Sequence, residues 1–208
     1  MYLHINKTNP LLIILDKGFF FLYDTPDFNK KIDMNIFFTD SDLAKCARDH
    51  DDKRLNKMII ETAQIASTAL WINNCDLAET LYSQHKIYLP SHENHPITKW
   101  CSSHVENFFH TISFLVELLF EYTLRFSKTH GTYRIFDSLC DDNVLWSINT
   151  TGNSSRQPNC TTHHKHIKDI HEAYRQELVL KWSKLDKHTP KWTNRNVPDF
   201  YQEYLNRR

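Results

Sequence analysis

The chain has 208 residues, enough for one full domain with a sizeable core, and its 40% hydrophobic and 13% aromatic residues are typical of a folded globular protein. Only three glycines occur, which argues against an all-β sandwich and against a glycine-rich phosphate-binding fold. Lys plus Arg and Asp plus Glu both number 25, so no overall positive field directs the chain to nucleic acid. Contact with DNA would need a local basic patch.

Residues 1–33 differ from the rest of the chain. The sequence LLIILDKGFFFLY predicts two short apolar strands around an Asp-Lys-Gly turn, which would form a β-hairpin. Met34 then opens a second unit, so we expect the working domain to start there and residues 1–33 to be an extension. The alternative is an ordinary N-terminal hairpin that belongs to the same domain.

The cysteines and the apolar runs indicate in which cellular compartment the protein works and whether it enters a membrane. Five widely spread cysteines without a C-x-x-C pair indicate reduced thiols. No apolar run approaches the 18 residues of a membrane helix, and LLIIL is too short for the core of a signal peptide. We therefore expect an intracellular, cytoplasmic protein without membrane contact.

The remaining elements are predicted to be mostly helical. In chain order we expect a short apolar strand after Met34, a helix from a cap at Asp40 or Ser41 to about Asp49, and helices over 52–71 and 77–83. Helical structure should follow over 96–128, in one piece or with a break near Cys101. A polar loop over 149–162, a helix over 167–185 and one or two helical turns after Pro198 complete the chain. The predicted fold class is mainly α, with one compact helical domain over 34–208 and a small β element at the N-terminus.

The helix predicted over 52–71 carries its charge in one narrow stripe. At 100° per residue, Arg54, Lys57, Glu61 and Gln64 fall within an arc of roughly 80°. Two interpretations remain open. Lys57 and Glu61 form a surface ion pair worth about 0.2–0.5 kcal/mol, or the stripe is the wall of a cleft in which a carboxylate flanked by cations does acid–base work.

Two further helices carry polar side chains. HPITKW places His95, Lys99 and Trp100 at a helix start, which is either a phosphate contact or, for Trp100, part of the core. The second polar stripe, which we expect to be a solvated face, consists of Glu106, His110, Glu117, Glu121, Arg125 and Lys128. Arg175, Lys181 and Lys184 either contact phosphates or form the polar outside of a core helix.

A cluster of potential metal ligands lies in CTTHHKHIKDIH. It contains Cys160, His163, His164, His166 and His171. Cysteine and histidine at such spacing bind zinc, but the chain has no evident second pair of ligands. We expect a basic, solvated loop, and we predict no metal and no cofactor.

The pattern D-x-R-L-x-K-x-x-x-E-x-x-Q, which starts at Asp52, resembles small phage and bacterial proteins labelled as pyrimidine-dimer DNA glycosylases, related to phage endonuclease V. The segments NHPITKWC, EYTLRF, EAYR and KWSK extend the likeness to uncharacterised phage-borne members over most of residues 34–193. To the characterised enzyme the likeness consists of an Asp, a Leu three residues on and a Glu nine residues on.

The resemblance implies a helical protein that binds double-stranded DNA and flips a nucleotide out of the stack. An amine would attack the sugar C1′ and form a Schiff base, with Glu61 at the position of the assisting glutamate. The family's nucleophile is an N-terminal α-amine, which Met34 would supply if translation starts there. Otherwise a lysine such as Lys57 must serve, or there is no lyase activity. Arg54, Gln64, His95, Lys99 and Trp100 would then bind the substrate.

Two other functions fit the same residues. A virus-encoded transferase that modifies DNA bases also needs a carboxylate and a basic groove. A non-catalytic protein that binds nucleic acid needs only the groove.

Overall fold

In the computed structural model, the described residues are 35–184 and 189–207. The chain divides into two units after Asp33, and all described residues belong to the second unit. The expected hairpin and Met34 lie outside the described residues. The expectation that residues 1–33 form an extension therefore stays a prediction.

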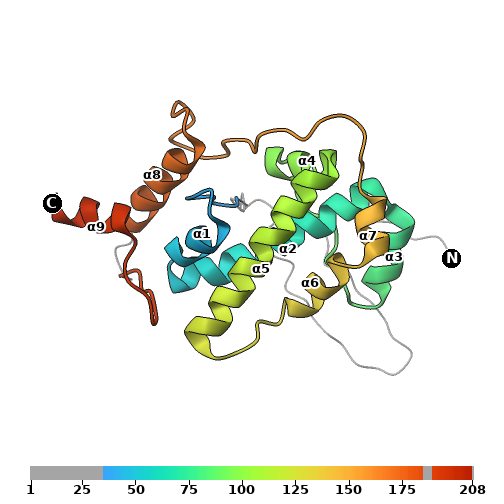
Figure 1. The fold of residues 1–208 in the computed structure, drawn as a ribbon, viewed down its shortest axis with the longest axis horizontal. Coiled ribbons are helices and arrows are strands. Elements are labelled where there is room, and N and C mark those ends of the chain that lie inside the picture. Colours follow the sequence, from blue (N-terminus) through green and yellow to red (C-terminus); the bar gives the residue numbers. More distant parts are fainter. Residues whose placement is uncertain (1–34, 185–188, 208) are drawn as a thin grey trace, which may run out of the picture. The chain divides into compact units, whose positions relative to one another are not determined.

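The described part of the chain is mainly α-helical and contains no strand, which confirms the predicted fold class (Figure 1). Its helices are α1 (Leu43–Asp49), α2 (Asp52–Asn73), α3 (Cys75–Ser83), α4 (Pro96–Ser103), α5 (Val105–Phe126), α6 (Tyr133–Leu139), α7 (Asp142–Ser147), α8 (Ile170–Ser183) and α9 (Asp199–Asn206). None of these helices is both long enough and apolar enough to cross a membrane.

Two 22-residue helices, α2 and α5, form the centre of the described unit. They pack against each other, α4 packs against both, and α1 packs against α5 (Figure 1). The core side of α2 is the one that its sequence predicts. Its fully buried hydrophobic residues include Leu55, Met58, Ile59, Ile65, Ala66, Ala69 and Leu70. Burial of these hydrophobic side chains stabilises the packing of α2, because each large aliphatic side chain contributes about 1.5–3 kcal/mol to the free energy of folding.

Helix ends follow the capping residues of the sequence. Asp42 accepts hydrogen bonds from two backbone N–H groups of α1, and Asp51 accepts one from Arg54 N. The break expected near Cys101 lies at His104, whose extended backbone separates α4 from α5 and whose ring accepts from Glu106 N. These side chains satisfy amides that have no partner inside their own helix.

The prediction of a strand after Met34 is wrong, because residues 35–40 are irregular. Residues 35–39 are nevertheless buried. Side chains satisfy the backbone of this segment in place of a neighbouring strand. His171 Nδ1 donates to Phe38 O at 2.9 Å, and Arg175 Nη1 donates to Thr39 O at 3.1 Å. An apolar run alone therefore did not distinguish a strand from a buried irregular segment.

The solvated face expected on α5 needs correction. Glu121 and Arg125 are buried, with 3% and 2% of their surface exposed. On the same helix an apolar stripe faces outward, and its members are Phe109, Val116, Phe120 and Leu124. The inward charges are tolerated because they pair with each other and with a distant segment, which helical periodicity does not reveal.

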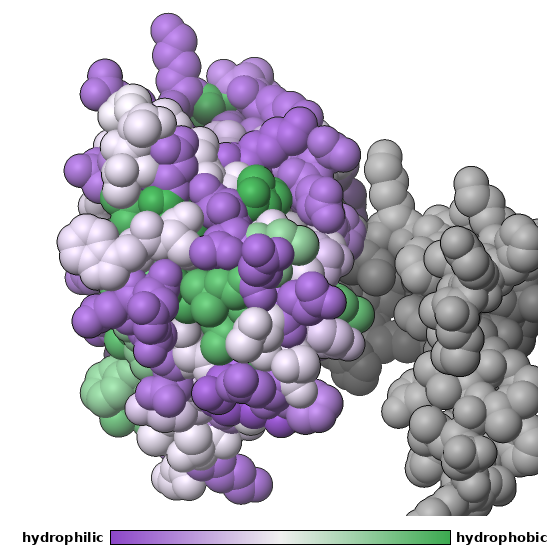
Figure 2. Space-filling model, turned by 90° about the vertical axis from the view of Figure 1, so that its right-hand side faces the viewer, coloured by the Kyte–Doolittle hydropathy of each residue, from purple (hydrophilic) through white to green (hydrophobic). Residues whose placement is uncertain are grey.

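Helices α6 and α7, which lie between α5 and the polar loop, were not predicted. Asp141 caps α7 through Asn143 N, so a capping signal was present. On the side of the molecule where α3 and α7 lie, hydrophobic residues form small patches among hydrophilic ones (Figure 2). This mixture is typical of a surface in contact with water.

We predict that residues 34–208 fold without the preceding segment. The truncated protein should melt cooperatively within a few degrees of the full chain, since about 1 kcal/mol shifts Tm by roughly 2–4 °C at this size. Calorimetry of both proteins measures the difference. A larger loss would mean that residues 1–33 contribute to the core, and Met34 would no longer be a candidate start of the working domain.

Candidate functional site

The stripe on α2 contains a buried carboxylate beside a half-exposed amine. Glu61 is 5% exposed, and its Oε1 lies 3.5 Å from Lys57 Nζ. The Lys57 side chain is 49% exposed. The ion pair between i and i+4 is therefore present, but its carboxylate does not lie on the surface, as the surface-pair interpretation required.

The other two residues of this stripe have separate contacts. Arg54 Nη1 lies 3.2 Å from Asp51 Oδ2, and the guanidinium is 5.7 Å from the centre of the Trp182 ring. Burial lowers the pKa of Arg54, while Asp51 opposes that shift. Gln64 is partly buried, and its backbone oxygen accepts from Thr68. Arg54 thus helps to fasten the start of α2 to α8.

On α4 the three predicted substrate-binding residues lie differently. His95 caps the helix, and its Nδ1 accepts from Ile97 N at 3.3 Å. Lys99 is exposed. Trp100 is 8% exposed, and its indole donates to Ser155 O at 2.7 Å. Trp100 therefore belongs to the core, as the alternative interpretation held, and it also lines a cavity.

The Trp100 cavity has a volume of about 350 Å³. Its lining includes Trp100 from α4, His110 from α5 and His171 from α8. Burial lowers the pKa of His110, which favours its neutral form. His171 Nδ1 donates to Phe38 O, so the acceptor of its neutral ring is Nε2. The side chain of Gln157 lies beside His110 in this cavity and opposes the shift of its pKa.

A second and larger hollow lies between α1, α8 and the segment that leads into α9; its volume is about 550 Å³. We call it the Asp49 cleft, and its charged lining includes Lys45, Arg48, Asp49, Glu172, Arg175 and Arg195. Asp49 is 6% exposed and accepts a hydrogen bond from the Thr39 hydroxyl at 2.7 Å. Burial raises the pKa of Asp49 to about 6, although the Thr39 hydrogen bond and Lys45 oppose that shift.

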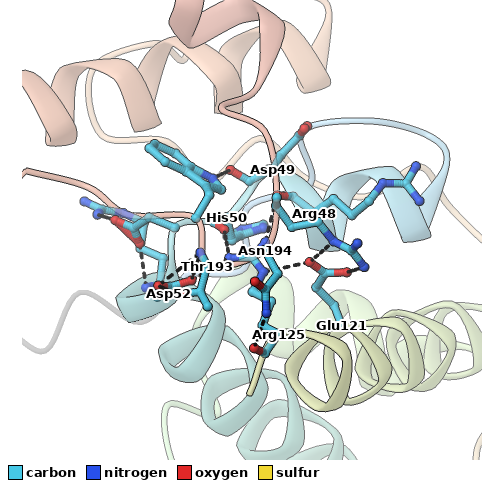
Figure 3. Close-up of polar contacts among 12 residues, drawn as sticks. Arg48, Asp49, His50, Asp52, Glu121, Arg125, Thr193 and Asn194 are labelled. Atoms are coloured by element: carbon cyan, nitrogen blue, oxygen red, sulfur yellow. Dashed lines mark hydrogen bonds and ion pairs between the residues drawn. The ribbon is translucent and has the colours of Figure 1, made fainter. Parts of the chain in front are cut away.

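The cleft owes its shape to a buried arginine (Figure 3). Arg125 Nε donates to Glu121 at 2.7 Å, and Nη1 donates to His50 O at 2.8 Å and to Asp52 at 3.0 Å. Arg125 Nη2 donates to Arg48 O at 2.9 Å. One guanidinium therefore fixes residues 48–52, which connect α1 to α2.

The tail segment, residues 189–198, closes the same junction. Trp192 Nε1 donates to Asp49 O, and Thr193 N and Oγ1 donate to Asp52. Asn194 Nδ2 donates to Arg125 O. Arg195 donates to both Glu121 oxygens at 2.8 and 2.9 Å. Burial alone would raise the pKa of Glu121, but the hydrogen bonds from Arg195 and Arg125 outweigh it and hold this pKa below its usual value.

The segment that follows the predicted polar loop is fastened to α8 by the buried carboxylate of Glu177, which is 1% exposed. His163 Nδ1 and His164 Nδ1 lie 3.1 and 3.0 Å from its two oxygens. Within residues 35–184 and 189–207, no group of three or more potential ligands is arranged to hold a metal ion. The cysteine-histidine cluster thus includes two histidines that anchor this segment.

Asp49, Glu121 and Arg195 are the functional or positioning residues that sequence reasoning missed. Asp49 ends a seven-residue helix, and nothing in its local pattern distinguishes it from a solvated helix end. Glu121 and Arg195 are 74 residues apart, so their pairing has no local signal. The one signal in the sequence that could have indicated the burial of Arg125 is its spacing relative to the apolar residues of the same helix.

Arg125→Ala should destabilise the protein by about 3–5 kcal/mol, because removal of one partner leaves buried charge and two backbone oxygens uncompensated. Lys128→Ala is the control, since Lys128 is exposed and follows the same helix; its effect should stay within about 0.5 kcal/mol. Urea unfolding measures both. Equal stabilities of the two variants would contradict the role assigned to Arg125.

Asp49→Asn should stabilise the protein at pH 8 by about 2 kcal/mol, because ionised Asp49 is unfavourable in the fold and Asn is not charged. A pKa of about 6 in the folded protein lies above that of the unfolded chain. The contribution of protonated Asp49 to stability is therefore full below about pH 4 and is lost as the pH rises through 6. Denaturation at pH 4, 6 and 8 tests this. Asp137→Asn, at an exposed position on α6, should change stability little at any pH.

Comparisons with known proteins found no match to a family model, to a curated protein or to a solved structure. The resemblance to DNA glycosylases of the phage type therefore stays an expectation from the sequence.

Proposed function

We propose that this protein is a DNA-acting enzyme of the glycosylase/lyase type that works on damaged or modified bases in double-stranded DNA. The observation that carries the proposal is the pair on α2, in which the buried carboxylate of Glu61 lies 3.5 Å from the half-exposed amine of Lys57. The pattern around Asp52 that resembles the glycosylase family includes both residues.

The pair has the two groups that Schiff-base chemistry needs. A lysine amine is nucleophilic only when it has lost its proton, and Glu61 Oε1 is close enough to accept that proton. Because Glu61 is buried, its carboxylate is shielded from water and interacts strongly with charge beside it. Lys57 is accessible enough to meet a sugar carbon of bound DNA.

The proposed reaction starts when Lys57 gives a proton to Glu61. The neutral amine attacks the sugar C1′, the bond from C1′ to the base breaks, and the base leaves with the bonding electrons and a proton from the new ammonium group. The nitrogen lone pair then expels the ring oxygen, which takes the proton from Glu61. The products are a free base, a protonated Schiff base on Lys57 and an ionised Glu61.

Two alternatives predict different behaviour toward the same DNA. If Met34 supplied the amine, the covalent bond would form at an α-amino group instead of Lys57. A base-modifying transferase or a non-catalytic DNA-binding protein would form no Schiff base at all. Trapping followed by peptide mapping therefore distinguishes the proposal from each alternative.

Borohydride added to the protein and a duplex with an abasic or damaged site should trap a covalent complex, and the adduct should map to Lys57. Lys57→Arg should abolish the adduct, because guanidinium keeps its proton. Lys53→Arg, an exposed lysine on the same helix, is the matched control and should trap as the unaltered protein does. Glu61→Gln should slow trapping by about 10²-fold or more while Tm changes little.

Two results would contradict the proposal. One is the absence of any adduct with a folded protein that binds the duplex, which would leave the base-modifying transferase and the non-catalytic DNA-binding protein. The other is an adduct that persists in Lys57→Arg, which would assign the nucleophile to another amine.

A further inference from the structure

The Asp49 cleft brings three arginines from different parts of the chain to one hollow. Arg48 comes from α1, Arg175 from α8 and Arg195 from the tail segment, and all three line the cavity of about 550 Å³. Planar guanidinium groups bind phosphate oxygens through parallel N–H groups. The cleft therefore presents the residue type that suits a phosphate group.

Each of these arginines keeps N–H groups that no described residue uses. Arg195 donates to Glu121 through Nε and Nη2, which leaves Nη1. Arg175 donates through Nε to Glu172 and through Nη1 to Thr39 O, which leaves Nη2. The Arg48 side chain is exposed and makes no hydrogen bond or ion pair with any described residue. Existing contacts thus orient two of the three guanidinium groups and leave part of each available.

The cleft lining also contains acidic residues, and one of them, Glu172, offsets part of the charge of Arg175. Glu172 is paired with Arg175 at 2.9 Å, and Glu203 is paired with Arg207 at 3.5 Å. Asp199 lies exposed in the first turn of α9. Asp49 is the one buried carboxyl of the cleft lining, and it makes no ion pair with a described residue.

We propose that the Asp49 cleft binds a phosphate group through Arg48, Arg175 and Arg195, and that Asp49 takes up a proton when the phosphate binds. The phosphate belongs either to a nucleic-acid backbone or to a free phosphate compound. The site goes beyond the function proposed for Lys57 and does not depend on it.

Proton uptake follows from the charges around Asp49. Thr39 and Asp40 face it from the irregular segment, Lys45 from its own helix and Arg175 from α8. The pKa of Asp49 is already raised to about 6 by burial, and a bound anion would raise it further. By linkage, the affinity for phosphate must then fall as the pH rises through the range in which Asp49 ionises.

The first probe is a fluorescein-labelled 12-nucleotide strand without a terminal phosphate, so that the charge of its diester groups does not change between pH 5 and 8. Fluorescence anisotropy gives its affinity for the full-length protein. The second probe is inorganic phosphate alone, measured by calorimetry at pH 6. Binding of the strand but not of phosphate assigns the cleft to a backbone, and binding of phosphate itself assigns it to a free phosphate compound.

Arg48→Ala should weaken binding of whichever probe binds by about tenfold or more, as expected for the loss of a charged hydrogen bond. Its fold should be unchanged, because only its backbone oxygen contacts Arg125. Arg134→Ala is the matched control, since Arg134 is an exposed arginine on α6 outside the cleft. Lys57→Arg should bind as the unaltered protein does, which separates this site from the proposed catalysis.

Asp49→Asn tests whether Asp49 takes up a proton when the phosphate binds. The ratio of its affinity to that of the unaltered protein should be near one at pH 5 and several-fold larger than one at pH 7.5. Effects of pH that the two proteins share cancel in this ratio. Equal weakening by Arg48→Ala and Arg134→Ala, no binding of either probe, or a ratio that does not change with pH would overturn the proposal.

Discussion

The buried Arg125 guanidinium joins the turn between α1 and α2 to α5. It is 2% exposed and contacts two carboxylates and two backbone oxygens, so nearly all of its hydrogen-bonding capacity is used. A buried cation is costly unless it is satisfied in this way. The turn between α1 and α2 therefore follows a path that brings Arg48 O, His50 O and Asp52 to the guanidinium.

The tail segment completes this arrangement from the other side. Arg195 forms a bidentate pair with Glu121, the same carboxylate that Arg125 contacts. One carboxylate between two guanidinium groups gives a defined geometry, because each fork fits the carboxylate in few orientations. The position of Asp49 is consequently set by its neighbours along the backbone, while its own side chain has only the Thr39 hydroxyl as a described partner.

Helical periodicity predicted the parts of the fold that depend on local sequence. The extent of α2 and the break between α4 and α5 near Cys101 follow from spacing and from capping side chains, although the cap of α1 is Asp42 and not Asp40 or Ser41. Residues 35–40 could not be predicted in this way, because side chains about 130 residues away satisfy their backbone. The burial of Glu121 and Arg125 on α5 could not be predicted for the same reason, since Arg195 of the tail segment supplies a partner for Glu121.

The candidate site divides in the same manner. Lys57 and Glu61 lie one helical turn apart, so their proximity could be predicted from the sequence, but the burial of Glu61 depends on tertiary packing. The Asp49 cleft was beyond prediction, because three separate segments supply its arginines. Local spacing thus identifies pairs within a helix, and it does not identify hollows that form where distant segments meet.

The pairing of Glu121 and Asp52 with residues so far along the chain has a consequence for synthesis. On the ribosome, α1, α2 and α5 are complete well before Thr193 and Arg195 have been made. Until then Glu121 and Asp52 lack their tail partners, and the turn between α1 and α2 is open on that side. Contacts of such long sequence separation form late. The nascent chain must therefore carry an unfinished junction until its C-terminal region emerges.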